Sequence, residues 1–248
     1  MTAAGLFMLV VATGCSGDTY RWGWYEVLPI TPQGASNLRF LLNGAGLTLA
    51  LSIVSLSASV LIGLLVSLPG LSRRPWLILA NRLYVEVFRA VPVLVMILWV
   101  YYGLPIVADI SLGPFTAGIL ALTLCDSAFE AEIFRGGIQS IEPGQLEAAD
   151  AIGLNYYQKM RLVVLPQAVR RILPPLGNQF VTMLKMSSLV SVVGLQELTR
   201  RANELTVTVY RPLEIYTVLV AEYLVLILAA SWCVRRLERK MGRATPAA

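Results

Sequence analysis

The sequence predicts an all-α membrane protein with about five core transmembrane helices. Three observations support this fold class. Of the 248 residues, 56% are hydrophobic and only 14% are charged, whereas a soluble domain has about 25% charged residues. Residues 40–72 contain no charged side chain, and this run exceeds the roughly 20 residues that cross a bilayer. The basic residues gather at the ends of apolar segments, as membrane orientation requires.

The first crossing is predicted over residues 44–68, and Pro69 and Gly70 are expected to end it. Small residues give this helix a face on which another transmembrane helix can approach closely. That face consists of Gly44, Gly46, Ser52, Ser55, Ser57, Ser59 and Gly63.

The second crossing is predicted to begin near Ile78 and to continue through residues 90–108. Pro92 interrupts this run, and Gly103 and Pro105 close it. Because proline removes a helical hydrogen bond, we expect an irregularity at Pro92 rather than a straight helix.

Three further crossings follow. The third begins with the apolar run 110–125 and continues through "DSAFEAEIFRGG". The fourth lies in 172–195, where Pro174, Pro175, Gly177 and Lys185 break the apolar pattern. The last spans about 213–234 and ends in the basic "VRRLERKMGR".

The distribution of Lys and Arg predicts the orientation. The 71–76 loop, the 135–171 region and the C-terminus are rich in basic residues, whereas the 104–114 loop has none. The positive-inside rule therefore places the first three regions in the cytoplasm and the residues before the first helix outside. Arg200, Arg201 and Arg211 are the exception, since they fall outside in this scheme.

Residues 1–37 form an N-terminal segment, followed by a transmembrane domain over 38–240 and a tail over 241–248. Residues 1–17 are uncharged, and three fates remain open: a retained sixth, short membrane segment, cleavage, or lipidation at Cys15. The aromatics of "YRWGWYEVLP" (20–29) are typical of a membrane interface.

The most polar long stretch lies in the middle of the chain and predicts a short helix. Pro143 suits a first helical turn, and Glu147 near that start favours the helix dipole. Leu146, Ala149 and Ile152 recur at three-residue spacing as one apolar stripe. This helix is too short to cross a bilayer, so it needs a partner surface. An amphipathic helix lying on lipid is the alternative.

A corner and a second helix follow. Gly153 can adopt the left-handed conformation that ends a helix, and Asn155 can cap the next one. The second helix is predicted to run to about Leu165, where Pro166 breaks or kinks it.

These residues carry a resemblance. "EAADAIGLNYYQKMRLVVLP" resembles the EAA loop of membrane subunits of ATP-binding-cassette importers, with Val163 where isoleucine is usual. The matching positions are Glu147, Ala148, Ala149, Gly153, Leu165 and Pro166.

Other segments are similar to the polar amino acid branch of these permeases, and the resemblance covers roughly residues 38–240. They are "YVEVFRAVPVLVMILWVYYGLP", "EIFRGGIQSIEPGQLEAA", "LPQAVRRILPPLGNQF" and "SLVSVVGLQEL". The chain departs from the branch at Ala90-Val91 before Pro92, and at Met186, where an acidic residue is usual. The resemblance implies that these departures bear on local polar contacts and on the substrate range, whereas the EAA loop is untouched.

The resemblance implies a type I importer permease fold and a coupling mechanism. Two such permease subunits, the same or related, form the pathway. The coupling loop, about 138–166, seats its short helix in a cleft of a cytoplasmic ATPase subunit, and an extracytoplasmic binding protein delivers the amino acid. ATP and Mg²⁺ then belong to the ATPase, and no cofactor is expected on this chain.

The sequence argues against an enzyme. It contains no histidine and no G-x-x-x-x-G-K-[ST] motif, which excludes histidine-based catalysis, histidine metal sites and this route to ATP hydrolysis. The three cysteines, Cys15, Cys125 and Cys233, are interpreted as buried inert thiols. No catalytic residue, metal site or nucleic-acid partner is predicted.

Acidic residues within the predicted crossings are candidates for the transport pathway, because such residues are rare in membranes and often mark one. They are Asp126 and Glu130, four residues apart on one helix face, and Glu222 in the last helix. A structural role is the alternative for each. Tyr101 and Tyr102 are candidates for the pathway entrance, with interface anchoring as the alternative.

Two local ion pairs are also predicted, Glu132 with Arg135 and Glu86 with Arg89. An importer of amino-acid-like conjugates such as opines would share all these features. An ion-coupled transporter that relays protons through the three acids is the main rival, but it leaves the EAA spacing unexplained and no inverted repeat supports it.

Overall fold

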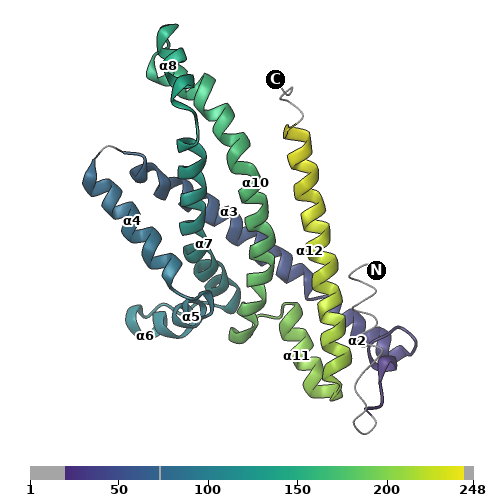
Figure 1. The fold of residues 1–248 in the computed structure, drawn as a ribbon. Helices are drawn as coiled ribbons and strands as arrows, with labels where there is room; N and C mark the ends of the chain where they lie inside the picture. Colours follow the sequence, from purple (N-terminus) through teal and green to yellow (C-terminus); the bar gives the residue numbers. More distant parts are fainter. Residues whose placement is uncertain (1–19, 73, 243–248) are drawn as a thin grey trace.

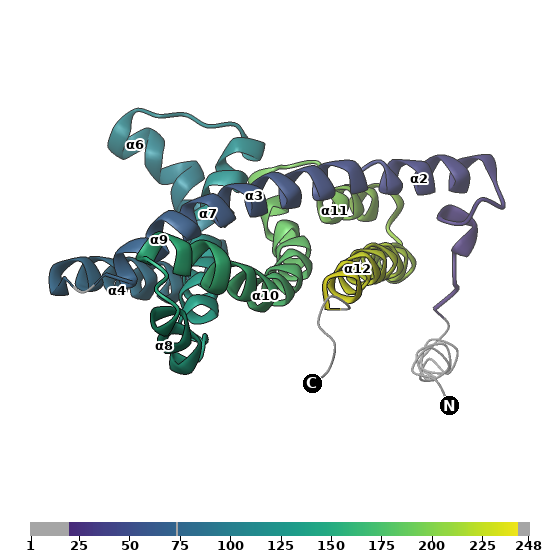
Figure 2. The same ribbon diagram turned by 90° about the horizontal axis from the view of Figure 1, so that it is seen from above.

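The computed structural model describes residues 20–72 and 74–242, and for residues 240–242 it describes the backbone alone. Long helices form a bundle, and all regular elements in the described part of the chain are helical. Figure 2 shows α3 running along one side of this bundle, with α7 and α10 beside it. The predictions for residues 1–17 and for Cys15 fall outside the described residues.

The N-terminal part of the bundle consists of the short 3₁₀ turn η1 (Trp24–Glu26), α2 (Pro32–Leu42) and α3 (Ala45–Gly70). Thr31 starts α2, because its Oγ1 atom accepts the Gly34 N–H at 3.0 Å. The helix α3 continues through Pro69 and ends at Gly70, two residues later than predicted.

The small-residue face of α3 is confirmed at Ser52, Ser55, Ser59 and Gly63, which are all buried. It packs along α7 (Pro114–Gln139), the central helix of the bundle. A Cβ atom on Gly63 would lie only 2.5 Å from the Glu130 Cβ, so glycine is required for this approach. Ser57 is exposed and Gly46 has open space beside it, so these two predictions were wrong.

The second predicted crossing is not one helix. It divides into α4 (Pro75–Ala90), α5 (Val93–Leu98), the π-helical turn η2 (Trp99–Gly103) and α6 (Leu104–Ala108). The two halves meet at an angle of 94°. Val91 is extended because a residue before proline avoids the α conformation. Gly103 and Pro105 do not close the helix, which runs on to Ala108.

The C-terminal half contains α8 (Pro143–Ala151), α9 (Tyr156–Lys159), the π-helical turn η3 (Met160–Val164) and α10 (Leu165–Met186). These last three join without a break, so Pro166 does not break the helix. The helical hydrogen-bond pattern widens instead in the π-helical turn η3, just before Pro166, which accommodates a residue that has no N–H to donate.

The 3₁₀ helix η4 (Ser187–Val193), α11 (Leu198–Val209) and α12 (Pro212–Gly242) complete the fold. Gly194 ends η4 with a φ of 92°. The last helix is longer than the predicted 213–234. Cys125 is buried, but Cys233 on α12 is exposed, which corrects the prediction for that thiol.

Two described stretches are long and apolar enough to cross a membrane, Pro32–Gly70 and Pro212–Arg239. The bent pair from α4 to α6 is a third if its two halves count as one span. The helices α7 and α10 have 26 and 22 residues but carry more polar side chains. The five predicted crossings correspond to α3, α4 with α5, α7, α10 and α12. Figure 1 shows α8 and the C-terminal end of α12 at one end of the molecule, and α6 and α11 at the other.

Candidate coupling loop and transport pathway

The helix α8 projects from the bundle beyond the end of α7 (Figure 1). Glu147 and Ala148 are exposed on it, as the coupling prediction requires. Ala149 is only 3% exposed, so it packs against this chain. The proposed stripe is therefore corrected: Leu146 and Ile152 face outward, but Ala149 does not.

Gly153 turns the chain after α8, and its predicted left-handed conformation is confirmed by a φ of 76°. The Leu154 N–H donates to the Ala149 carbonyl at 3.0 Å and closes the helix end. A Cβ atom at Gly153 would meet nothing within 4 Å. Backbone conformation, and not space, is therefore what favours glycine here.

Asn155 caps α9 as predicted. Its side chain accepts the Gln158 N–H at 2.9 Å, and the Gln158 side chain accepts the Asn155 N–H at 3.0 Å. This reciprocal capping box fixes the start of the second helix.

An ion pair that the sequence analysis missed spans this corner. Lys159 Nζ on α9 lies 2.6 Å from Asp150 Oδ1 on α8. The two residues are nine apart in the chain, so no helical spacing rule pairs them. We call the segment 150–159, with this pair and Gly153, the elbow.

The coupling loop is also held at its base. Arg171 on α10 donates to the Ser140 carbonyl at the end of α7. Leu165 and Pro166, the last matched positions of the loop, are exposed at the start of α10. The structure thus places the matched residues in three positions: α8, the elbow and the start of α10.

Asp126 lines a cavity of about 430 Å³ between α4, α5, α7 and α10, here called the Asp126 cavity. Ser59 Oγ donates to its carboxylate at 2.7 Å, and Gln179 Nε2 donates to the other oxygen. The Arg89 guanidinium lines the same cavity and lies 5.0 Å from the centre of the Phe129 ring. An acid and a base therefore face one mid-helix cavity.

The other two candidate acids, Glu130 and Glu222, do not line the Asp126 cavity. Glu130 lies on α7 against Gly63, is fully buried and is not among the residues that line the Asp126 cavity. Glu222 lies on α12. None of their carboxylate oxygens has a hydrogen-bond partner among the residues that the structure describes.

Tyr101 and Tyr102 lie in η2 and contact each other edge to face, with ring centres 4.8 Å apart. Tyr101 packs against the core, and Tyr102 is exposed. Neither lines the Asp126 cavity.

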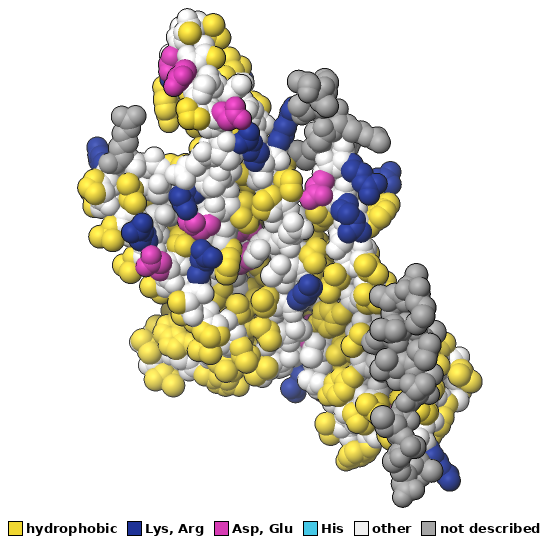
Figure 3. Space-filling model, viewed as in Figure 1, with side chains coloured by type: hydrophobic (Ala, Val, Ile, Leu, Met, Phe, Trp, Pro, Cys, Tyr) yellow, Lys and Arg dark blue, Asp and Glu magenta, His cyan; other side chains and the backbone are white. Residues whose placement is uncertain are grey.

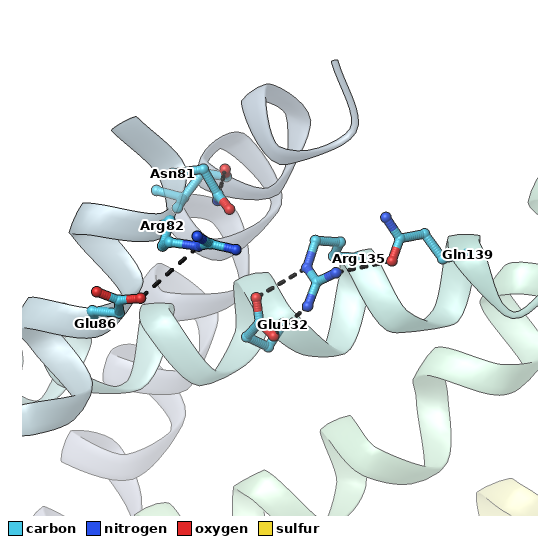
Figure 4. A network of polar contacts seen from close by, with 7 residues as sticks. Asn81, Arg82, Glu86, Glu132, Arg135 and Gln139 are labelled. Carbon is cyan, nitrogen blue, oxygen red and sulfur yellow. Dashed lines mark hydrogen bonds and ion pairs between the residues drawn. The ribbon is translucent and has the colours of Figure 1, made fainter. Parts of the chain in front are cut away.

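One of the two predicted ion pairs forms. Glu132 Oε2 lies 2.6 Å from Arg135 Nη2 on α7, and Arg135 also donates to Gln139 at 2.9 Å. Glu86 does not pair with Arg89 but with Arg82, at 3.9 Å, because Arg89 stacks on Phe129 of the neighbouring helix. Figure 4 shows the two pairs on facing helices.

These pairs border a second cavity of about 240 Å³, here called the α4–α7 cavity. Arg89 lines this cavity as well as the Asp126 cavity.

Figure 3 shows Lys and Arg side chains mostly over the half of the molecule that carries α8, whereas the opposite end is largely hydrophobic.

Two acids at the opposite end of the bundle were also missed. Glu214, buried in the first turn of α12, accepts the Gly23 N–H at 2.6 Å and the Tyr20 hydroxyl. Glu197 caps α11 by accepting the Arg200 N–H at 2.8 Å. The Glu214 bonds join the N-terminal segment to the start of α12, whereas the Glu197 bond is local to α11.

Comparison with known proteins identifies relatives of the whole bundle. Residues 59–243 match the family model described as "Binding-protein-dependent transport system inner membrane component". The chain is 37% identical to the glutamine transport system permease protein GlnP of Escherichia coli (strain K12), over 89% of this chain and 98% of that protein. It is 36% identical to the arginine transport system permease protein ArtQ of Bacillus subtilis (strain 168), over 82% and 92%.

Solved transporter structures also superpose on this chain. A chain of an amino acid ABC transporter crystallised with histidines superposes with a TM-score of 0.78 at 39% identity, over 83% of this chain and 96% of that one. The methionine transporter MetNI superposes with a TM-score of 0.71 at 22% identity, over 82% and 97%, which shows the shared fold.

Proposed function

The chain belongs to the binding-protein-dependent transport system inner membrane components, and from this premise we propose that it imports polar α-amino acids through a pathway that includes the Asp126 cavity. It is the membrane-spanning permease subunit of an ATP-driven importer and not an enzyme, since ATP hydrolysis belongs to a separate subunit. It has the type I importer permease fold.

The coupling role is assigned to α8. Glu147 and Ala148 are exposed at its surface, so they can enter a groove on the ATPase subunit, as a helix docks in a cleft. Gly153 and the Asp150–Lys159 ion pair fix the angle between α8 and the following helices. Leu165 and Pro166 begin α10, which carries the displacement into the bundle.

The substrate class follows from the charges at the Asp126 cavity. An α-amino acid carries one ammonium and one carboxylate, and the cavity presents the Asp126 carboxylate and the Arg89 guanidinium. Opposite charges in a low-dielectric site attract strongly. The named relatives that act on glutamine and arginine support this class.

The assembly follows from the family. An ATPase subunit and a substrate-binding protein are the partners of such a permease, in the inner membrane. We assign α8 and the C-terminal end of α12 to the cytoplasm. The second permease subunit of the pathway is another copy of this chain or a related chain. ATP and Mg²⁺ bind to the ATPase. The shared end of α8 and α12 and the basic side chains around it support this orientation.

Reconstitution tests the proposal. The chain is placed in proteoliposomes with its co-purified ATPase and binding protein, and uptake of labelled glutamine, arginine and an opine is measured with and without ATP. ATP-dependent uptake of an amino acid is expected, and Glu147→Arg is expected to abolish it while the complex still assembles. The matched control is Glu26→Arg, which reverses a charge in η1 at the opposite end of the molecule. Uptake by the chain alone, driven by a proton gradient and insensitive to Glu147→Arg, would contradict the proposal.

A further inference from the structure

The α4–α7 cavity is lined by charged side chains from two facing helices. Arg82, Glu86 and Arg89 come from α4, and Glu132 and Arg135 come from α7. On α4 the spacings are four and three residues, so the three side chains share one helix face. Figure 4 shows Arg82 and Glu86 opposite Glu132 and Arg135.

The exposed members of this cluster suit polar surroundings. From Arg82 to Arg89 the charged face extends about 10 Å along α4, toward the middle of the bundle. Arg82 and Glu86 are largely exposed, at 71% and 69% of their side chains. Charged side chains in contact with lipid are costly, and they normally face an aqueous cavity or the interior.

The cavity adjoins the Asp126 cavity, because Arg89 lines both. Arg135 and Gln139 lie farther along α7, next to the coupling loop. Polar side chains therefore follow one another from Asp126 through Arg89 and Arg135 to Gln139, toward the α8 end of the bundle.

The charges in the α4–α7 cavity do not balance. Glu132 binds Arg135 and Glu86 binds Arg82, but Arg89 makes no ion pair with any residue that the structure describes and stacks on Phe129 instead. Three guanidinium groups face two carboxylates, so the cavity lacks one negative charge. The carboxylate of an amino acid would supply it.

We propose that the α4–α7 cavity is a second binding station for the α-carboxylate of the transported amino acid, on the route from the Asp126 cavity to the cytoplasm. This inference rests on the proposed function. The carboxylate moves from Arg89, which both cavities share, to Arg135. Because Glu132 already holds Arg135 through two nitrogens, at 2.6 and 3.0 Å, the station binds the substrate weakly enough to release it.

The experiment measures inhibition from the cytoplasmic side. Proteoliposomes with the ATPase facing outward pump amino acid out of the lumen, and unlabelled amino acid is added on the ATPase side to slow transport. The decarboxylated amine of the same amino acid is the probe that lacks the carboxylate. The variants are Arg135→Gln, Glu132→Gln and Arg74→Gln. Glu132→Gln breaks the same ion pair but keeps the Arg135 guanidinium. Arg74→Gln is the matched control, an exposed arginine before α4 that does not line the cavity.

We expect the amino acid to inhibit and the amine not to inhibit. Arg135→Gln should raise the half-inhibitory concentration about tenfold or more, because a charge-assisted hydrogen bond is lost. Glu132→Gln should lower the half-inhibitory concentration, because Arg135 is then released to bind the carboxylate, while Arg74→Gln should leave it unchanged.

Two results overturn the inference. If Glu132→Gln raises the half-inhibitory concentration as much as Arg135→Gln does, the ion pair has only a structural role. If the amine inhibits as well as the amino acid, no carboxylate station exists there. In both cases ATP-driven transport persists, so the proposed function stands. Absence of ATP-driven transport in the unmodified complex would instead reject the proposed function, and this inference with it.

Discussion

Lys159 Nζ lies 2.6 Å from Asp150 Oδ1 and joins the two helices on either side of Gly153. The Asp150 side chain is 61% exposed and the Lys159 side chain 21%. The ion pair therefore contributes little to overall stability, about 0–1 kcal/mol. Its consequence is geometric, because it restrains the angle at which α8 leaves the bundle.

Loss of this ion pair should weaken coupling without unfolding the permease. Asp150→Asn or Lys159→Met is expected to lower the ratio of amino acid transported to ATP hydrolysed several-fold, because movement of α8 is partly absorbed at the elbow. Parallel uptake and phosphate-release assays measure this ratio. The exchanged pair, Asp150→Lys with Lys159→Asp, should recover most of it, and a ratio that stays normal in both single variants would show that the pair is dispensable.

The conformation of Gly153 predicts a graded response to substitution. Its φ of 76° costs a residue with a Cβ about 1–2 kcal/mol, and a β-branched residue suffers most. Gly153→Val should therefore reduce transport strongly, while Gly153→Asn should retain much of it because asparagine tolerates this region. Gly144→Ala, in the same loop with open space around it, is the control for an added methyl group. Equal effects of valine and asparagine would contradict the conformational explanation.

Contact between α3 and α7 makes Gly63 critical for stability. A Cβ at this position would lie 2.5 Å from the Glu130 Cβ and 2.9 Å from the Ser127 carbonyl oxygen, so Gly63→Ala should destabilise the permease by about 1–3 kcal/mol. Thermal unfolding of the purified complex measures the effect. Gly46→Ala in the same helix meets no atom within 4 Å, and its melting temperature should be unchanged or higher.

Asp126 and Glu130, both on α7, should differ in function. Asp126→Asn preserves size but removes the charge that faces the Asp126 cavity, so uptake should fall at least tenfold while the amount of complex stays normal. Glu130→Gln should leave uptake nearly unchanged, because Glu130 does not line that cavity. Initial uptake rates at matched protein levels compare them. If Glu130→Gln lowered uptake more than Asp126→Asn, the pathway would instead pass Glu130, where α7 packs against α3.

The orientation makes a labelling prediction. In a chain with its three cysteines replaced by serine, Glu142→Cys at the start of α8 should react with a membrane-impermeant thiol reagent only from the cytoplasmic side. Ser111→Cys, exposed between α6 and α7, should react only from outside. Labelling of both from one side would reject the proposed topology.

The elbow could be predicted from the sequence because its determinants are local. Gly153 and Asn155 act on their own backbone and on residues three positions away. The same holds for Glu132 and Arg135. In these cases spacing along the chain decides the contact.

Contacts between helices escaped prediction. Glu86 has Arg82 four residues before it and Arg89 three residues after it, and only the neighbouring Phe129 ring decides that Arg89 turns away. Likewise, Ala149 fitted an apolar stripe, but the packing of the elbow buries it against its own chain. The 94° bend after α4 had a local cause at Pro92, yet its angle depends on how α5 packs against α7.

The unbroken connection from α9 through η3 into α10 has a mechanical consequence. From Tyr156 to Gln179 the chain forms one continuous rod, roughly 35 Å long. Its near end adjoins the elbow, and near its far end Gln179 donates a hydrogen bond to Asp126. If α8 seats on the ATPase and Asp126 lies in the pathway, as proposed, a tilt of this rod would move Gln179 relative to Asp126. The nucleotide state of the ATPase and the contacts to the substrate would then change together.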